Sequence, residues 1–242
     1  MNCKTKKIMK DATALTAISP LVLEWAQKKG KRTPNNKDQY FYNGYKKQAE
    51  YNKKPENITI KENEFVVCFA GSLVRQFDFD LLIETAKRMK DKNIKFYICG
   101  YGMLYEELKE KTKELSNVTM TGWLEKEELD YVLNKSKVGF APYRNTFDFQ
   151  TGISNKFAEY LAYGLPIILT SDGCMEELIK QNECGITSRN PEEIRKFILT
   201  LQEDSIKYKR MQKSARTLFD ENFVAEKIYS KLADYLEKIG GK

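Results

Sequence analysis

The sequence contains no histidine, which excludes imidazole acid–base chemistry and most zinc sites from this chain. It has five cysteines, an odd number, and none are paired at the Cys-x-x-Cys spacing of redox and zinc motifs. Cys68 and Cys99 lie inside apolar runs, where a free thiol behaves as a small hydrophobic side chain. This cysteine usage favours a reducing compartment over a disulfide-bonded fold.

Long apolar segments are also absent. No run approaches the roughly 20 apolar residues that a membrane-spanning helix needs, and the basic N-terminus lacks the apolar core of a signal peptide. We therefore expect a cytoplasmic protein. The net charge of +7 suits an anionic ligand such as a nucleotide diphosphate. It also suits peripheral contact with the anionic inner membrane face, although solvated surface lysines account for it more simply. Because the charge is spread out, we expect no nucleic-acid partner.

Short apolar runs alternate with amphipathic helical segments between Glu64 and Ser188. This alternation predicts an α/β fold with a doubly wound, Rossmann-like parallel sheet. The strands are expected at Phe65–Ala70, Ile94–Cys99, Val118–Thr121, Val138–Ala141, Pro166–Leu169 and Gly185–Thr187. In such sheets a ligand binds outside the carboxyl ends of the strands. That rule selects the loops at Gly71, Gly100, Trp123, Pro142 and Ser171.

The two ends of the chain do not fit this pattern. Thr13–Ile18 is strand-like and Leu21–Gln27 is typical of a short helix. Residues 28–63 are polar with little periodicity, and we interpret them as a connection between domains with local order around residues 40–45. Residues 206–219 and 225–239 predict two amphipathic helices.

Two glycine-containing turns are candidate ligand loops. Gly71-Ser72-Leu73 follows the first strand, and glycine there lets a phosphate or a sugar approach the backbone. Gly100-Tyr101-Gly102 follows the second strand, but it is not the dinucleotide fingerprint. An ordinary tight turn explains the first loop equally well, and Tyr101 is either a surface residue or a ligand contact.

The most informative segment begins with Thr151, Gly152 and Ile153 and continues through a helix to Gly164. Ser154 or Asn155 is a suitable N-cap. Lys156 then lies in the first turn, where a cation opposes the helix dipole unless an anion binds the same helix end.

Glu159 lies one turn further along the same face and can accept hydrogen bonds from a ribose diol. The simpler alternative is a Lys156–Glu159 surface ion pair.

Charged residues also follow the strand that ends before Pro142. On this loop Arg144 could reach a phosphate and Asp148 a sugar hydroxyl, although loop charges are more often only solvated. Glu176 and Glu177 open a helix, where the dipole simply favours acidic residues.

Taken in order, these segments resemble the C-terminal domain of the group 1 glycosyltransferases, which have the GT-B fold. The resemblance covers residues 65–239. It is carried by Phe69-Ala70-Gly71-Ser72-Leu73, Asp80-Leu81-Leu82-Ile83, Ile98-Cys99-Gly100-Tyr101-Gly102, Asn117-Val118-Thr119-Met120-Thr121-Gly122-Trp123 and, most specifically, residues 155–168 from Asn155-Lys156-Phe157-Ala158-Glu159-Tyr160 to Gly164-Leu165-Pro166-Ile167-Ile168.

The resemblance also implies an assignment for the N-terminal and C-terminal segments of the chain. Residues 12–24 resemble the last strand and helix of the family's N-terminal domain, so 1–63 are expected to be a remnant of the acceptor domain plus the interdomain linker. Residues 64–222 are then the donor-binding domain, and 223–242 the helix that crosses back. The missing domain belongs to a partner subunit or to a longer protein, so the chain is an isolated segment, a truncated gene product or half of a split enzyme.

The resemblance implies retaining transfer from a UDP-, GDP- or ADP-sugar to a glycan or lipid-linked acceptor, without an essential metal or other cofactor. Lys156 and Glu159 are the candidate catalytic residues, with Glu159 holding the ribose. The loop at Gly122-Trp123-Leu124 borders the base, and Gly71 borders the diphosphate. Ser154, Asn155 and Lys156 lie near the diphosphate and the sugar.

Two departures from the family pattern concern charge. A glutamate that the family often has eight positions before Glu159 is Thr151 here. An Arg and a Lys that many members carry in the first loop correspond to Ser72 and Phe77. Diphosphate neutralisation must therefore come from elsewhere, with Lys156, Arg144 and Arg75 as candidates.

Two other functions remain open. The departures and the missing domain also fit a non-catalytic nucleotide-sugar-binding or regulatory module. A nucleotide-sugar epimerase would need acid–base side chains in both halves, and no such constellation is found.

Overall fold

A computed structural model of the chain describes residues 3–46, 53–90 and 92–241. The core is a six-stranded parallel sheet with the strand order β5-β4-β3-β6-β7-β8. Its strands are β3 (Phe65–Ala70), β4 (Ile94–Cys99), β5 (Val118–Gly122), β6 (Val138–Ala141), β7 (Ile167–Leu169) and β8 (Gly185–Thr187). The central strands are apolar and buried along their whole length, as expected for a parallel sheet covered on both faces.

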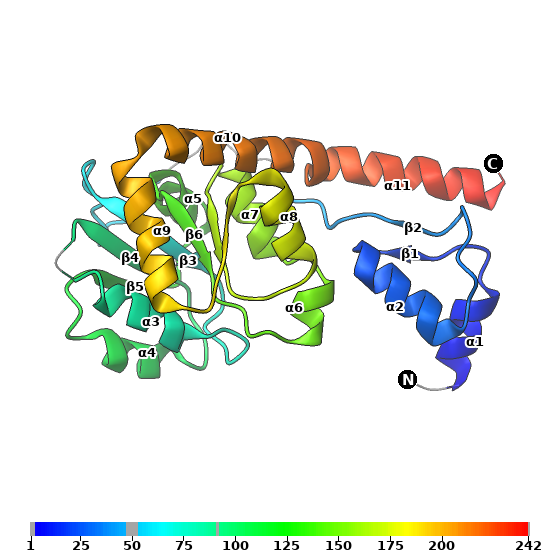
Figure 1. Cartoon of the computed structure of the whole chain (residues 1–242), viewed down its shortest axis with the longest axis horizontal. Coiled ribbons are helices and arrows are strands. Elements are labelled where there is room, and N and C mark those ends of the chain that lie inside the picture. Colours follow the sequence, from blue (N-terminus) through cyan, green and yellow to red (C-terminus); the bar gives the residue numbers. More distant parts are fainter. Residues whose placement is uncertain (1–2, 47–52, 91, 242) are drawn as a thin grey trace.

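Helices connect successive strands and cover the sheet (Figure 1). They are α3 (Phe79–Lys87), α4 (Tyr105–Thr112), α5 (Lys126–Lys135), α6 (Phe147–Thr151), α7 (Asn155–Ala162), α8 (Cys174–Asn182), α9 (Pro191–Glu203) and α10 (Ser205–Asn222). Helix α3 packs against α4 and α9, whereas α10 packs against α7 and α8. Right-handed crossovers in opposite directions from β3 place α3 and α4 on one face and α7 and α8 on the other. The predicted doubly wound fold is confirmed.

The point where the strand order reverses lies between β3 and β6. Their backbone pairing is confined to Val67 opposite Val138 and Cys68 opposite Gly139, so the two strands separate toward their carboxyl ends. The hydroxyl of Tyr160, from α7, bridges the separation by accepting from the N–H of Ala70 at 3.0 Å and donating to the carbonyl of Phe140 at 3.2 Å. This reversal is where the fold class places ligands.

A smaller unit lies beside the sheet and is reached by the long final helix (Figure 1). It contains α1 (Cys3–Asp11), β1 (Thr16–Ala17), α2 (Pro20–Gly30) and β2 (Gln39–Tyr40), and β1 pairs with β2 in parallel. Helix α11 (Ala225–Gly240) runs from the sheet domain over this unit, where the Tyr235 hydroxyl donates to the carbonyl of Lys37.

Three features of the small unit and the loops differ from the predictions. Helix α1 was not expected, and none of its side chains is fully buried among the described residues, although its half-buried Met9 packs against Gly30 of α2. Helix α6 was expected as a loop, because five residues are too few for a helical period. The strand expected over Thr13–Ile18 is only two residues long. Residues 47–52, inside the predicted interdomain connection, lie outside the described residues.

The Arg32–Asp38 ion pair organises the small unit. Arg32 Nη2 lies 2.8 Å from Asp38 Oδ1, and the two side chains are 6% and 1% exposed. Burial acts to raise the pKa of Asp38, but hydrogen bonds from Arg32, Gln27 and the N–H of Leu15 outweigh it and lower that pKa. Arg32 also donates to carbonyls of the α1–β1 connection, including Thr13 at 3.3 Å.

Replacing Asp38 with Ala should therefore loosen this unit. The change leaves a buried guanidinium without its carboxylate partner, and we expect the free energy of local opening to fall by about 3 kcal/mol. Amide hydrogen exchange would show faster exchange over residues 3–41 and unchanged protection in β3 and β4. Glu24→Ala is the matched control, because its ion pair with Lys28 is exposed. Equal protection in both variants would contradict the assigned role of Asp38.

Candidate functional site

A cavity of about 300 Å³ opens at the carboxyl ends of β3 and β4, beside the strand-order reversal. The structure brings six predicted site residues together in its lining, three from the two glycine loops, two from the loop after β5 and one from α7. The lining consists of Ala70, Gly71, Ser72, Cys99, Gly100, Trp123, Leu124, Leu129 and Glu159. Of the five loops expected to border the ligand, those at Gly71, Gly100 and Trp123 converge on this cavity. The loops at Pro142 and Ser171 do not line it.

The two glycine loops are in direct contact with each other. Gly71 and Gly100 adopt φ angles of +141° and +140°, a region that favours glycine. A Cβ on Gly100 would lie 1.9 Å from the Gly71 carbonyl oxygen, and one on Gly102 would lie 2.6 Å from the Leu73 carbonyl oxygen. Gly100 and Gly102 are therefore required by loop packing, whatever binds in the cavity.

Helix α7 follows α6 in the connection between β6 and β7. Ser154, one of the two predicted N-cap residues, is the N-cap, and its Oγ accepts from the N–H of Phe157 at 3.1 Å. The buried hydroxyl of Tyr143 donates to the same oxygen. Asn155 is exposed and Ile153 is buried with 4% exposure, so Ile153 serves the core. The capped start of α7 presents Lys156 and Glu159 from one turn of helix.

The ammonium of Lys156 lies between two aromatic rings and a glycine. Its Nζ is 4.2 Å from the ring centroid of Phe69 and 5.3 Å from that of Phe77. An added Cβ on Gly71 would come within 2.3 Å of this Nζ, so Gly71 leaves room for the cation. Desolvation lowers the pKa of Lys156 to about 8, against the opposing effect of the Glu159 carboxylate. The ammonium is therefore charged at neutral pH but poorly solvated.

The position of Lys156 compensates for a lysine that many members of the resembled family carry in the first loop and that this chain lacks. Phe77 occupies the position where many members of the resembled family have a lysine, and its ring supports the Lys156 ammonium. A cation reaches the Gly71 loop from α7 instead of from the loop itself. Among the three candidate cations, Lys156 is the one that the structure brings to Gly71.

Arg75 and Arg144 line a different and larger cavity of about 350 Å³, together with Asp80, Glu107 and Lys111. Arg144 Nε donates to the carbonyl of Arg75 at 2.9 Å, which ties the two loops together. Lys111 is paired with both Asp80 and Glu107 at 2.8 Å. Although this cavity is larger, Gly71, Gly100 and Glu159 do not line it. All three line the smaller cavity, which is therefore the better candidate site.

Glu159 faces the smaller cavity and is held by a residue that the sequence did not single out. The hydroxyl of Tyr45 donates to Glu159 Oε1 at 2.6 Å. Glu159 and Lys156 do not form an ion pair in the described part of the chain, so the surface-pair alternative is wrong. Tyr45 lies in a Lys-, Asn- and Tyr-rich segment without periodicity, and no sequence signal distinguished it from its neighbours.

Exposed aromatic side chains border the mouth of the cavity. Trp123 is 73% exposed, and its indole N–H donates to Glu125 at 3.3 Å. Tyr101 is 56% exposed and packs on Tyr105 with a centroid separation of 4.8 Å. Leu124 and Leu129 supply the apolar wall beneath Trp123. A flat, partly apolar ligand group would find both stacking and apolar contact here.

Comparisons with known proteins agree with this geometry. Residues 50–218 match the family described as glycosyl transferases group 1. The chain belongs to the group 1 glycosyltransferases. A curated relative, glucosyltransferase 3 of Streptococcus gordonii, is 28% identical over 127 residues, covering 49% of this chain and 38% of the relative.

Solved glycosyltransferase structures share the fold. A mutant of S. aureus TarM, solved with fondaparinux, alpha-GlcNAc-glycerol and UDP, superposes with a TM-score of 0.71 at 19% identity, covering 97% of this chain and 46% of TarM. HepE of Anabaena, solved with UDP and glucose, gives 0.72 at 17%, covering 94% and 64%. Sucrose-phosphate synthase of Thermosynechococcus elongatus gives 0.76 at 15%, covering 98% and 60%. This glycosyltransferase chain thus spans about half to two thirds of these structures and has the fold of a GT-B C-terminal domain.

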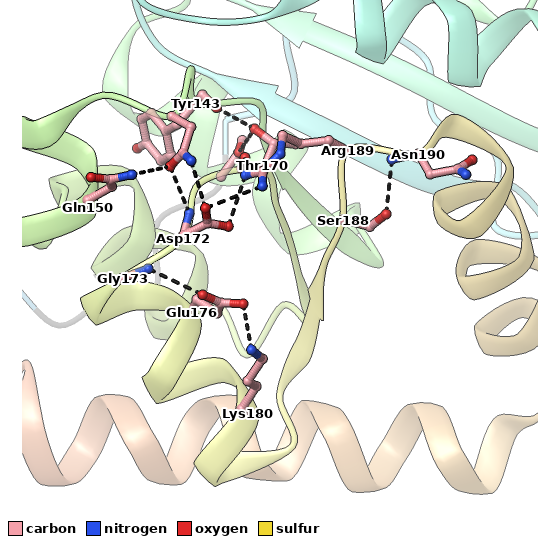
Figure 2. A network of polar contacts seen from close by, with 12 residues as sticks. Tyr143, Gln150, Thr170, Asp172, Gly173, Glu176, Lys180, Ser188, Arg189 and Asn190 are labelled. Atoms are coloured by element: carbon pink, nitrogen blue, oxygen red, sulfur yellow. Dashed lines mark hydrogen bonds and ion pairs between the residues drawn. The ribbon is translucent and has the colours of Figure 1, made fainter.

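In this glycosyltransferase domain, a polar network fixes the loops after β6 and β7 (Figure 2). Asp172 pairs with Arg189 at 3.0 Å and accepts from the Asn145 amide at 2.6 Å, and the Arg189 bond is the main cause of its lowered pKa. Gln150 donates to Asn145 at 3.0 Å, so the network reaches α6. The network holds the chain immediately before α7.

Thr151 and Gly152 end α6 within this rigid loop. The Thr151 hydroxyl donates to the carbonyl of Phe147 at 2.8 Å, and the Thr151 carbonyl accepts from the Ser19 hydroxyl of the small unit. Gly152 caps α6 through its N–H, which donates to the backbone carbonyl of Asp148 at 2.9 Å. The structure does not bring these two residues into the lining of the candidate cavity.

Within residues 3–46, 53–90 and 92–241, no cluster of three or more acidic or cysteine side chains could hold a metal ion. In the same ranges no helix combines the length and apolar character that crossing a bilayer requires.

The desolvated ammonium of Lys156 predicts a specific dependence of stability on pH. Its folded-state pKa of about 8 lies below the ordinary value of 10.5, so the unfolded state binds more protons between these values. Stability therefore rises with pH across this window. We expect Lys156→Met to be more stable than the wild type by about 1–2 kcal/mol at pH 7, and the difference to shrink by pH 10.

Urea denaturation of both proteins at pH 7, 8, 9 and 10 measures this difference. Lys209→Met, at an exposed lysine of α10, corrects for the general titration of surface lysines. A Lys156→Met variant that is less stable than the wild type at every pH would show that the ammonium stabilises the fold.

Proposed function

We propose that the cavity binds the nucleoside diphosphate portion of a nucleotide-sugar donor, and that the domain supports transfer of the sugar to an acceptor hydroxyl with retention at the anomeric carbon. The observation that carries the proposal is the arrangement of Lys156 and Glu159. One helical turn presents a poorly solvated cation beside Gly71 and a carboxylate on the cavity wall. Such a pair suits a ligand with a diphosphate at one end and a diol nearby.

Each part of the cavity has a chemical task in this proposal. The Lys156 ammonium and the N-terminus of α7 attract the diphosphate and stabilise the negative charge that develops on it as the glycosidic bond breaks. Glu159 accepts hydrogen bonds from the ribose hydroxyls. Trp123 and Leu124 border the base. The acceptor hydroxyl attacks from the face that the diphosphate leaves and transfers its proton to the leaving phosphate, so the proposal needs no side-chain base.

The structural relatives suggest the identity of the donor. TarM, HepE and a pneumococcal O-GlcNAc transferase were each solved with UDP, and the last two with a hexose or hexosamine as well. We propose a UDP-hexose or UDP-N-acetylhexosamine as the donor. We also propose a role in glycan or glycolipid synthesis on the cytoplasmic side of the membrane. GDP- and ADP-sugars are the alternatives to be tested beside it.

We place the acceptor site outside the sheet domain. The chain spans only 46% of TarM and 64% of HepE, and among the described residues its small unit contributes two short parallel strands. A two-stranded parallel sheet is a poor platform by itself, because parallel sheets are normally covered on both faces. The proposed activity therefore requires an acceptor-binding domain or partner subunit that packs against this small unit.

Thr151 supports a second candidate function, a non-catalytic nucleotide-sugar-binding module. The residue stands where the resembled family often has a glutamate, and its hydroxyl is satisfied within α6. The two functions differ in turnover and agree in donor binding, so slow hydrolysis of a bound UDP-sugar would favour the enzyme.

The Glu159→Ala variant tests the proposal. The wild type should bind one of UDP, GDP or ADP, with a rise in melting temperature by mass action. Glu159→Ala should raise that dissociation constant about 10- to 100-fold, because hydrogen bonds to a charged group are lost. Calorimetry gives the constants, and Glu221→Ala, at an exposed position near the end of α10, is the matched control.

Absence of binding by the wild type at millimolar concentration of all three nucleotides would overturn the proposed function. Binding that persists unchanged in Glu159→Ala would retain a nucleotide site but remove the ribose role from Glu159.

A further inference from the structure

Tyr45 is anchored by its backbone at the junction between α10 and α11. Its N–H donates to the carbonyl of Phe223 at 2.7 Å, and its carbonyl accepts from the N–H of Ala225 at 3.1 Å. A Cβ on Gly44 would lie 2.5 Å from the Cα of Ala225, so the segment approaches the junction as closely as a glycine allows. The position of the Tyr45 ring is therefore set by where α11 begins.

The same junction packs against the helix that carries Glu159. Phe223 is fully buried, stacks on Tyr42 with a centroid separation of 5.1 Å and meets the edge of Phe157 at 6.0 Å. Phe157 belongs to α7, as Glu159 does. Residues 42–45, the α10–α11 junction and α7 consequently form one packed unit.

The Tyr45 hydroxyl is suited to a permanent donor role. Burial, reinforced by the nearby Glu159 carboxylate, raises the pKa of Tyr45 far above its ordinary value, so the phenol stays protonated. Its bond engages Oε1 of Glu159. An ionised carboxylate has about four lone-pair sites, so Glu159 keeps the capacity to accept from two ligand hydroxyls.

Loss of this bond would free Glu159 to turn. Lys156 lies three residues before it on the same helix, within the range where opposite charges pair. A Lys156–Glu159 pair would withdraw the cation from Gly71 and the carboxylate from the cavity together. The Tyr45 bond thus favours an arrangement in which the Lys156 ammonium and the Glu159 carboxylate stay unpaired and can each contact a ligand.

We propose that Tyr45 is a positioning residue for ribose recognition, which holds Glu159 toward the cavity and makes nucleotide affinity depend on the position of the α10–α11 junction. This inference rests on the proposed function, and it assigns to the segment between the small unit and the sheet domain a direct part in the nucleotide site. Movement of α11 relative to α7 would then change affinity without any change in the cavity lining.

The test is the Tyr45→Phe variant, which keeps the ring and removes the donor. We expect its dissociation constant for UDP to rise about tenfold, as for loss of a hydrogen bond to a charged group. The constant for 2′,3′-dideoxy-UDP, which lacks the ribose hydroxyls, should change less than about twofold. If the wild type prefers GDP or ADP, that nucleotide and its dideoxy form replace the uridine pair. Calorimetry at pH 7 measures all four constants.

Two controls separate positioning from general damage. Tyr42→Phe removes a hydroxyl from the same segment, where the neighbouring phenol is that of Tyr40, and should leave both constants unchanged. On a Glu159→Ala background, Tyr45→Phe should cause no further loss of UDP affinity, because Glu159→Ala already removes the acceptor of the Tyr45 hydroxyl.

Four results would overturn the inference. Equal losses for UDP and its dideoxy form would show a structural role alone. A gain in UDP affinity would show that Tyr45 competes with the ribose. If the wild type binds a nucleotide through Glu159 and Tyr45→Phe binds it equally well, the inference is refuted and the proposed function stands. If the wild type binds no nucleotide, both are refuted.

Discussion

The hydroxyl of Tyr160 is the contact on which the site geometry depends. It lies where β3 and β6 separate, and it satisfies both the Ala70 N–H and the Phe140 carbonyl that the shortened ladder leaves unpaired. The ring can lie there because Gly139 has no side chain, since a Cβ would come within 2.4 Å of it. A buried unpaired backbone group costs about 1–3 kcal/mol, so the phenol fixes α7 at the strand-order reversal. The positions of Lys156 and Glu159 follow from that docking, because both lie on α7, with Lys156 beside Gly71 and Glu159 on the cavity wall.

The cavity is also shaped by contacts between backbone segments. The approach of Gly100 to the Gly71 carbonyl closes the space between the first two loops, and Gly71 leaves its outer side to the Lys156 ammonium. Phe69 and Phe77 then supply ring faces that favour a cation, although they also exclude water from it. The two effects oppose each other, and desolvation is the larger, as the lowered pKa of Lys156 shows.

The sequence predicted the parts of this structure that depend on local pattern. The six core strands, the N-cap at Ser154 and the convergence of Gly71, Gly100, Trp123 and Glu159 follow from apolar runs, capping chemistry and the rule for parallel sheets. Contacts between distant segments could not be predicted. Tyr45 reaches Glu159 across 114 residues, and nothing in its polar neighbourhood marks it. Similarly, three candidate cations were equivalent in sequence, and only tertiary packing separated Lys156 from Arg75 and Arg144.

The start of α7 carries an electrostatic conflict that an anionic ligand would relieve. A cation in the first turn of α7 opposes the helix dipole, and its surroundings of two rings and a glycine solvate it poorly. Pairing with Glu159 would relieve the conflict, but Tyr45 holds that carboxylate by another contact. An anionic group bound beside Gly71 relieves it instead, because an opposite charge raises the pKa of Lys156 and satisfies the helix N-terminus at once. Binding of the proposed diphosphate would therefore remove a cost that the folded protein already carries, and would couple ligand affinity to the stability of the domain.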